Sequence, residues 1–364
     1  MTFEIMNGVP LNDREQRILE AVIRTYVETA EPAGSRTVAK RFGLGVSAAT
    51  IRNAMADLEE KGFLYHPHTS AGRIPTDMAY RYYVDILMQP IRLSNAEQRM
   101  LRRQLADEAS GPIERVIRRA AQVLGLLTGE LGVAIAPRLE EVLLEKLELV
   151  PISSEKVLMV VTLQRGNVRA VYVDLPISVP NETLHAVSLI LNERLAGQTL
   201  ANLRATLPDR LRDAQLSDTP TELLNIFVQA AEHALDGRKP GEGEDVHLGR
   251  TSVIANQPEF ASEDRLKSLI ELTEQRELLG DILNAREHEN APIITIGSEN
   301  PDPRLNNFTL VTSEYRLGNV TGVLGVLGPT RMPYEKVAAI VEHASRLMTE
   351  LTSRPANAKD VTLH

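Results

Sequence analysis

The segment from residue 35 to residue 81 constrains the fold most, because it combines two short helical patterns with a tight turn between them. Apolar side chains recur at helical spacing in its first part, where Ser35 can cap a helix and Gly43 can end it in a left-handed conformation. The turn from Gly43 to Val46 is short, so a second helix that begins after Ser47 must pack across the first. The segment therefore predicts a helix-turn-helix.

The second helix has one apolar face and one face suited to reading DNA. The apolar residues fall on one side, where neighbouring helices can bury them: Ile51, Ala54, Met55 and Leu58. The opposite face begins with small residues, which let a helix backbone approach the floor of a major groove. Arg52 and Asn53 follow, and these residue types form bidentate hydrogen bonds with guanine and adenine edges. The pattern predicts a DNA-binding protein, although similar patterns occur in modules that bind only proteins.

A glycine and a polar loop after this helix predict a wing. Gly62 can end the helix, and residues 63–65 and 73–74 have the composition of two short strands. The loop between them is too polar for a core, but its hydroxyl and imidazole groups and Arg73 can lie along a phosphate backbone. The residues predicted to contact DNA are Ser35, Arg36, Ser47, Ala48, Ala49, Thr50, Arg52, Asn53, His66, His68, Thr69, Ser70 and Arg73.

The charge distribution agrees with this prediction locally. Residues 36–81 carry seven basic and four acidic side chains, a net charge of +3, whereas the whole chain carries −9. Positive potential is therefore concentrated in the segment that resembles a nucleic-acid module. A net charge of only +3 predicts sequence-specific binding that is assisted by dimerisation. It does not predict the nonspecific binding to nucleic acids that is typical of a strongly basic segment.

Other features of the sequence exclude several classes of protein. The chain has 364 residues, enough for two or three domains, and it contains no cysteine, which excludes disulfides, thiolate metal sites and cysteine nucleophiles. No apolar run approaches the roughly 20 residues that cross a bilayer, and the first ten residues lack the pattern of a signal peptide. We expect a cytoplasmic protein with no membrane segment and no cofactor.

No catalytic constellation stands out. His66 and His68 are close enough to share a strand face, but the local sequence supplies no further metal ligands. The tyrosines of residues 77–88 fit a core or dimer role better than a platform for stacked bases, because they follow helical spacing. Glycines 318, 322, 325 and 328 lack the residues of a phosphate-binding loop and indicate tight packing in a sheet. The prediction is a protein that is not an enzyme and holds no metal.

The rest of the chain predicts an α+β architecture, with an antiparallel meander of three strands in its middle and a linker at Gly237 to Asp245. Helices are expected at 11–29, 77–88 (opened by Thr76 and ended by Pro90), twice within 94–130 (the second from Pro112), and at 182–197, 221–235, 263–283 and 334–353. Strands are expected at 131–136 (ended by Pro137), 142–152, 156–163, 167–175, 251–256, 292–297, 308–315 and 319–328.

Three separated motifs give the sequence a family resemblance. They are SRTVAKRFGLGVSAATIRNAMADLEEKGFLYHPHTSAGRIPTDMAYRYYVD at residues 35–85, IGSEN at 296–300 and GVLGVLGPTRMPYEKV at 322–337. Taken together they resemble the bacterial heat-inducible transcription repressor family, HrcA. The likeness runs in order from about residue 11 to residue 351.

The resemblance implies an N-terminal winged helix-turn-helix at 1–90, a GAF-like α/β domain split between 91–137 and 247–353, and an α+β dimerisation domain at 138–246 inserted into it. The polar composition of residues 354–364 predicts a flexible tail. It also implies a homodimer that represses chaperonin and Hsp70-type chaperone operons. Such a dimer would bind an inverted-repeat operator in double-stranded DNA, leave it on heat stress, and be kept active by the chaperonin. A two-fold dimer can place the helix after Ser47 of each subunit in successive major grooves.

Three classes of function remain open on the sequence. A dimeric stress-gene repressor predicts salt-sensitive, operator-selective DNA binding. A ligand-responsive metabolic regulator predicts an operator affinity that changes with a metabolite. A nucleic-acid-processing enzyme predicts turnover, for which the sequence shows neither a metal site nor a nucleophile.

Overall fold

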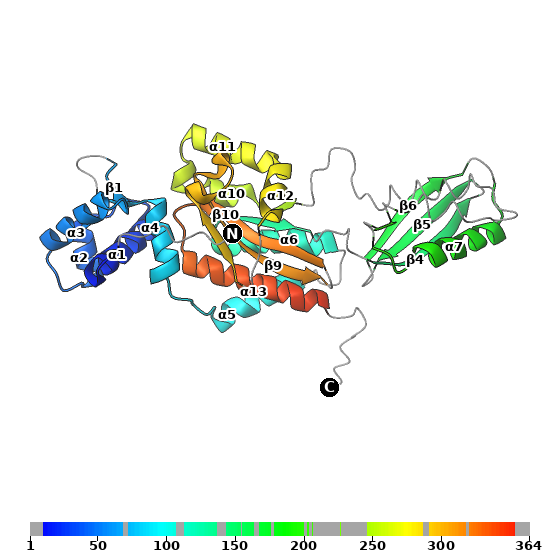
Figure 1. Ribbon diagram of the computed structural model, residues 1–364, viewed down its shortest axis with the longest axis horizontal. Helices are drawn as coiled ribbons and strands as arrows, with labels where there is room; N and C mark the ends of the chain where they lie inside the picture. Colours follow the sequence, from blue (N-terminus) through cyan, green and yellow to red (C-terminus); the bar gives the residue numbers. More distant parts are fainter. Residues whose placement is uncertain are drawn as a thin grey trace.

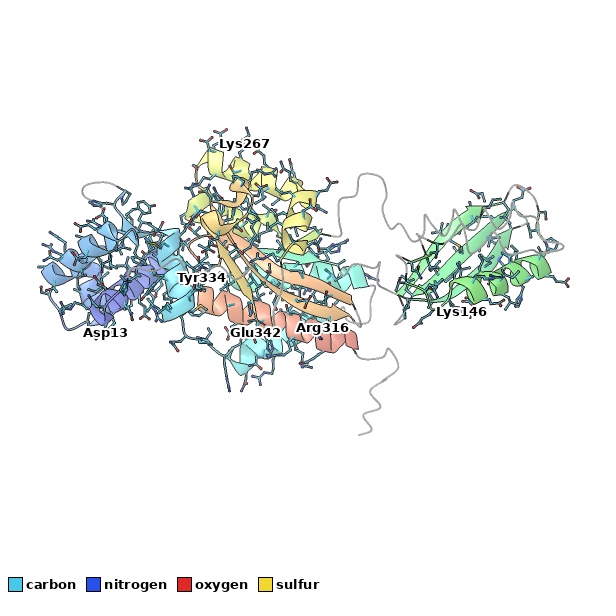
Figure 2. The ribbon with its side chains drawn as sticks, viewed as in Figure 1. Asp13, Lys146, Lys267, Arg316, Tyr334 and Glu342 are labelled. Carbon is cyan, nitrogen blue, oxygen red and sulfur yellow. The ribbon has the colours of Figure 1, made fainter. Side chains whose placement is uncertain are left out.

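A computed structural model describes residues 10–67, 72–106, 113–136, 143–153, 155–163, 167–175, 178–199, 202–203, 206, 226, 246–286, 291–317 and 320–353. Within these ranges the fold mixes helices and sheets in three units, which Figure 1 shows in a row. Asp13 of the first unit and Lys146 of the third lie toward opposite ends of the molecule (Figure 2). None of the helices so described is both long and apolar enough to span a membrane.

The first unit holds four helices and a small sheet: α1 (Asp13–Thr29), α2 (Ser35–Phe42), α3 (Ala48–Glu60), β1 (Leu64–Tyr65), β2 (Ile74–Pro75) and α4 (Asp77–Tyr82). The side chain of Asn12 caps α1, and the Glu15 carboxylate accepts the Asn12 amide in return. The strands β1 and β2 pair antiparallel, and Ala33 and Arg73 form a further bridge. Thr76 caps α4 as predicted. The helix then continues as a π-helical turn, η1 (Tyr83–Leu87), and ends at Met88 before Pro90.

The prediction that Ser35 caps α2 is wrong by one residue. Gly34 occupies the N-cap position in an extended conformation, and its carbonyl accepts the first helical hydrogen bond from Val38. Ser35 is therefore already inside the first turn, where it is buried and makes no capping bond. The predicted end of this helix is confirmed, since Gly43 is left-handed with a φ of 54°.

The central unit is a five-stranded antiparallel sheet in the order β7-β3-β10-β9-β8. Its strands are β3 (Leu131–Ile135), β7 (Val246–Leu248), β8 (Ile293–Ile296), β9 (Phe308–Leu317) and β10 (Val320–Pro329). Alternate residues face opposite sides, so Leu324 packs in the same cluster as α5 (Asn95–Ala106), α6 (Ile113–Thr128) and α13 (Tyr334–Ser353). Val323 instead belongs to the cluster formed with α10 (Thr251–Ala255), α11 (Glu263–Glu274) and α12 (Arg276–Asn284).

Two predictions for this unit need correction. Of the residues 251–256 predicted as a strand, 251–255 form the helix α10 and Asn256 is its C-cap; the strand of this region is β7, which lies just before them. A short apolar run does not by itself distinguish a strand from a buried helix. The single helix expected over 263–283 is broken at Gln275, whose ψ of 65° lies outside the helical range. The other strands and the last helix lie where they were predicted.

The glycines of β10 pack tightly against the neighbouring strand, as predicted. A Cβ atom on Gly325 would lie 2.3 Å from the carbonyl oxygen of Val311, and one on Gly322 would lie 2.5 Å from the Tyr315 ring. Side chains at these positions would push β9 and β10 apart. Gly318 lies outside the described residues.

The third unit follows β3 in the chain and precedes β7, so it is inserted between two strands that are neighbours in the central sheet. The predicted meander is confirmed as β4 (Leu144–Ser153), β5 (Lys156–Leu163) and β6 (Asn167–Asp174) in the order β4-β5-β6. The helix α7 (Asn181–Leu195) buries Leu184, Val187 and Leu191 in the core of this unit. Predictions outside the described residues concern Pro112, Pro137, the helix at 221–235 apart from residue 226, the linker at 237–245 and the tail at 354–364.

Candidate nucleic-acid interface

The helix α3 is held in place by its cap and by one buried face. Ser47 caps it as predicted, with its Oγ accepting the Thr50 amide at 3.1 Å. The residues predicted to face the core are all buried, namely Ile51, Ala54, Met55 and Leu58. Since α3 packs against both α1 and α2, its outward face has a defined direction.

The outward face of α3 presents the side chains predicted to read bases. Ala49, Arg52 and Asn53 are exposed, whereas Ala48 and Thr50 are half-buried. Small residues therefore lie at the start of the helix, and a guanidinium and an amide follow one turn later. This is the arrangement that a helix needs to approach a major groove closely and still form hydrogen bonds with base edges.

Fewer basic side chains are free than the sequence suggested. Four of the seven in residues 36–81 form ion pairs: Arg41 with Glu28, Lys61 with Glu15, Arg73 with Glu59, and Arg81 with Glu299. Arg36, Lys40 and Arg52 are exposed and form no ion pair with a described residue. The positive charge available to a ligand is thus concentrated on α2 and α3.

One of these ion pairs joins the end of α3 to the start of α1. The Lys61 ammonium, just after α3, lies 2.6 Å from the carboxylate of Glu15 in the first turn of α1. The hydrogen bond from Lys61 holds the pKa of the Glu15 carboxyl below its usual value, against the opposing effect of burial. Lys61 therefore ties α3 to α1 instead of adding a free charge to the interface.

Other predicted contact residues are placed differently. Ser35 is buried, so its hydroxyl does not form part of the surface. Arg73 has a side chain only 18% exposed, and Nη2 lies 2.7 Å from Oε2 of Glu59. His66 is half-buried, and His68, Thr69 and Ser70 lie outside the described residues. The predicted contact residues that are exposed are Arg36 on α2, Ser47 at the cap of α3, and Ala49, Arg52 and Asn53 on α3. The spacing of the last three places them on one face of that helix.

Sequence reasoning missed the polar residues that attach this unit to the central sheet. Asp77 and Arg81 of α4 bind Ser298 and Glu299, and Arg331 binds the carbonyl of Val27. The available signal was the presence of charged residues in the glycine-containing motifs at 296–300 and 322–337. In the described ranges we find no group of three or more histidine, aspartate or glutamate side chains that could hold a metal ion.

Comparison with known proteins places the chain among transcription repressors. The family model for the HrcA protein C terminal domain matches residues 114–338. A heat-inducible transcription repressor HrcA of Chlorobium phaeobacteroides (strain BS1) is 37% identical over 353 residues, which is 94% of this chain and 99% of that protein. The repressor of the same name from Chlorobium limicola is 36% identical over 96% of this chain and 100% of its own length. That from Pelotomaculum thermopropionicum is 35% identical over 94% and 97%.

A solved structure has a similar fold over nearly the whole chain. It is described as the crystal structure of a hypothetical protein at 2.2 Å resolution, and it matches with a TM-score of 0.65 and 21% identity. The match covers 94% of this chain and 99% of that one. The fold of this chain therefore also occurs in an experimentally determined protein.

Proposed function

Because the chain belongs to the HrcA family of heat-inducible transcription repressors, we propose that it represses chaperonin and Hsp70-type chaperone operons by binding an inverted-repeat operator as a homodimer. The observation that carries the proposal is the outward face of α3, where small residues precede Arg52 and Asn53. Three cations on α2 and α3 that pair with no described carboxylate supply the attraction for phosphates. The protein acts in the cytoplasm, without enzymatic activity of its own.

The first unit is, in this proposal, a winged helix-turn-helix that ends near residue 90. Support comes from the left-handed Gly43 between α2 and α3, the capped start of α3, and the antiparallel pair of β1 and β2 after it. In such folds the second helix of the motif enters the major groove. Ser47 and the first turn of α3 would then lie nearest to the DNA.

The central sheet with its helices is the GAF-like domain of the proposal, made from residues 91–137 and 247–353. The unit inserted at 138–246 is the dimerisation domain. The supporting topology is that the chain leaves the central sheet after β3 and returns in β7 beside it. An insertion between adjacent strands leaves the central sheet intact.

An uncovered apolar face supports the assignment of the inserted unit to dimerisation. Val150 pairs with Leu158, and Leu158 pairs with Tyr172, so these three side chains form a row across the sheet. Tyr172 is 65% exposed and Val150 is 42% exposed, while α7 packs on the other face. Exposed apolar patches of this kind mark interaction surfaces. A second copy of the chain would bury the row and supply the two-fold symmetry that an inverted repeat requires.

The response to heat follows from the need for a folded dimer. Each subunit contributes one half-site contact, and only the linked pair combines both contacts into tight binding. If the folded dimer is marginally stable, warming depletes it and frees the operator, and chaperonin that refolds the chain restores it. Repression therefore falls when chaperonin is occupied by other unfolded proteins.

A footprint on the organism's own chaperonin promoter tests the proposal. We expect protection of a symmetric inverted repeat, stronger when chaperonin is added and weaker after heating. Protection of an unrelated promoter alone would reject the stress-gene assignment. An operator affinity that follows a metabolite and ignores chaperonin would favour a ligand-responsive regulator.

A further inference from the structure

The first unit is bonded to the edge strand of the central sheet. The strand β8 is the last in the sheet order, and Ile294 and Ile296 are two residues apart, so their backbone groups point to the same edge. The Ile294 carbonyl accepts a hydrogen bond of 2.6 Å from Nη2 of Arg81, and the Ile296 amide donates one of 2.8 Å to Glu299. Arg81 and Glu299 are themselves joined by two hydrogen bonds of 2.7 and 2.5 Å. This ion pair thus occupies the edge of β8 as a neighbouring strand would.

Asp77, one helical turn before Arg81, forms a second attachment. Its Oδ2 atom accepts hydrogen bonds from the amide and the hydroxyl of Ser298, at 3.0 and 3.1 Å. Gly297 has a φ of 51°, and a Cβ atom there would lie 2.1 Å from the same oxygen. Only glycine allows the carboxylate to come this close in that backbone conformation. Asp77 and Arg81 lie on one face of α4, so the whole face is bound to the turn after β8.

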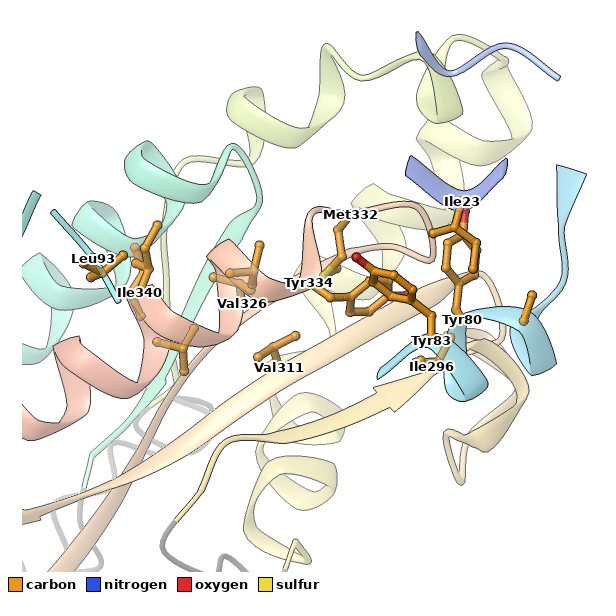
Figure 3. Packing of buried hydrophobic residues seen from close by; sticks show 14 of the residues in the cluster. Ile23, Tyr80, Tyr83, Leu93, Ile296, Val311, Val326, Met332, Tyr334 and Ile340 are labelled. Atoms are coloured by element: carbon orange, nitrogen blue, oxygen red, sulfur yellow. The ribbon is translucent and has the colours of Figure 1, made fainter. Parts of the chain in front are cut away.

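Further contacts reach α1 and the start of α13. Nη1 of Arg331 donates to the carbonyl of Val27 at 2.7 Å, while Glu259 binds the rest of the same guanidinium. The rings of Tyr80 and Tyr334 are both buried, with their centroids 5.6 Å apart (Figure 3). One hydrophobic cluster therefore runs from the helices of the first unit into the central unit. Since α3 packs against α1, its direction is set relative to the sheet.

We infer that the α4 joint, made by Asp77 and Arg81 with residues 297–299, fixes the direction of α3 and so the separation of the two α3 helices in a dimer. Arg81 then contributes to operator recognition by positioning α3. It does not contact a phosphate itself, although it is one of the seven basic residues in the segment 36–81. The inference rests on the proposed function. A first unit that could turn freely would still bind a half-site, but it would lose discrimination between repeats of different spacing, because many separations would then be accessible.

Spacing selectivity is the functional test. An operator selected from random duplexes with the wild-type protein is remade with the spacer between half-sites shortened or lengthened by one to five base pairs. We expect wild-type affinity to fall by about tenfold or more as the spacer changes, and the Arg81→Ala affinities to stay within about threefold of one another. A smaller fraction of folded protein would lower the apparent affinity for all spacers equally, so it could not by itself remove the dependence of affinity on spacer length. Arg81→Lys, which keeps the charge but cannot form the same paired bonds, should behave like Arg81→Ala.

Asp85→Ala is the matched control, since Asp85 is the exposed partner of Arg81 within the same helix and does not touch the sheet edge. It should keep the wild-type dependence on spacing. The inference is wrong if Arg81→Ala keeps that dependence, even if its affinity is lower throughout. A wild-type protein that binds no selected duplex contradicts the proposed function instead.

A second measurement needs no DNA. The chain has no cysteine, so Asp57→Cys on α3 and Glu342→Cys on α13 give two unique positions for spin labels, both exposed; Figure 2 shows Glu342 on its helix. Labelled chains are diluted with unlabelled ones, so that distances within one subunit dominate. We expect a narrow distance distribution that broadens with Arg81→Ala or Glu299→Gln and stays narrow with Asp85→Ala. Equal widths in all variants would overturn the inference.

Discussion

The guanidinium of Arg73 is bonded to Glu59, with 2.7 Å between Nη2 and Oε2, so a side chain predicted to hold a phosphate instead connects the start of β2 to the end of α3. The pair is partly covered, since the Arg73 side chain is 18% exposed and that of Glu59 34%. The backbone of Arg73 also exchanges two hydrogen bonds with Ala33. Arg73 therefore contributes to the arrangement of β2 around the helices.

Arg73→Ala should lower the melting temperature and leave the salt dependence of operator affinity nearly unchanged. Partly exposed ion pairs contribute on the order of 1 kcal/mol or less, so the change in stability is modest. Arg36→Ala is the comparison, because Arg36 is exposed and unpaired among the described residues, and it should reduce the slope of log affinity against log salt by about 1. Operator affinities of both variants and the wild type, measured at several salt concentrations, give the slopes to be compared. An equal loss of slope in both variants would show that Arg73 leaves Glu59 to bind a phosphate.

Arg52→Ala and Asn53→Ala should each cost about 1 to 3 kcal/mol in operator binding and relax the preference for particular bases. The physical reason is that both side chains are exposed on the outward face of α3, where no described carboxylate competes for Arg52. Affinities for operators with single base changes supply the test. Asp57→Ala, also exposed on α3, removes a negative charge and should change all affinities alike. If the Arg52 and Asn53 variants keep the wild-type base preference, residues other than these two contact the bases.

Local chemistry explains what could be predicted from the sequence. The Ser47 cap, the left-handed Gly43 and the buried face of α3 depend on residues a few positions apart, and all were correctly predicted. The meander of β4 to β6 was predictable for the same reason, since short turns connect alternating patterns. Ser35 was misplaced by one residue because Gly34 can also adopt the extended N-cap conformation.

Long-range pairing explains what could not be predicted. In the sequence, Arg81 is one more basic residue of a predicted DNA-binding segment. Its carboxylate partner, Glu299, lies 218 positions away, so no local pattern indicates the ion pair. In the sequence, three of the paired cations could equally attract phosphates, and only the fold shows that a carboxylate lies beside each: Lys61, Arg73 and Arg81. Net charge along a sequence therefore overestimates the charge that a folded surface offers to DNA.

Tyr172→Glu should weaken the proposed dimer by about tenfold or more, because it places a carboxylate in the exposed row on β4 to β6, at its most exposed position. Operator affinity should fall with it, while binding to a single half-site stays the same. Sedimentation at a series of concentrations measures the first effect. Leu189→Glu is the control, since Leu189 is 60% exposed on α7 of the same unit. If the control dissociates the dimer and Tyr172→Glu does not, the helix face carries the interface.

A buried carboxyl group lies near the contacts between the first and central units. Glu130, just before β3, is 2% exposed, and its Oε2 atom accepts a hydrogen bond of 2.9 Å from Gln257. A Cβ atom on Gly328 would lie 2.3 Å from that oxygen, so β10 packs directly on the carboxyl. Burial raises the pKa of Glu130 to about 8, although the Gln257 hydrogen bond acts in the opposite direction.

Glu130 should make the fold less stable as pH rises. Its pKa is about 4.5 in the unfolded chain and about 8 in the folded one, so its contribution is fully favourable below pH 4.5, declines through the interval and levels off above pH 8. The decline is on the order of 1 kcal/mol per pH unit within that interval. Glu130→Gln, which cannot ionise, should flatten the dependence of melting temperature on pH between 5 and 8. Glu342→Gln, at an exposed position of α13, should leave it unchanged. Parallel curves for wild type and Glu130→Gln would mean that the carboxyl ionises in the folded protein near its ordinary pKa, with water or a rearranged neighbour compensating for its burial.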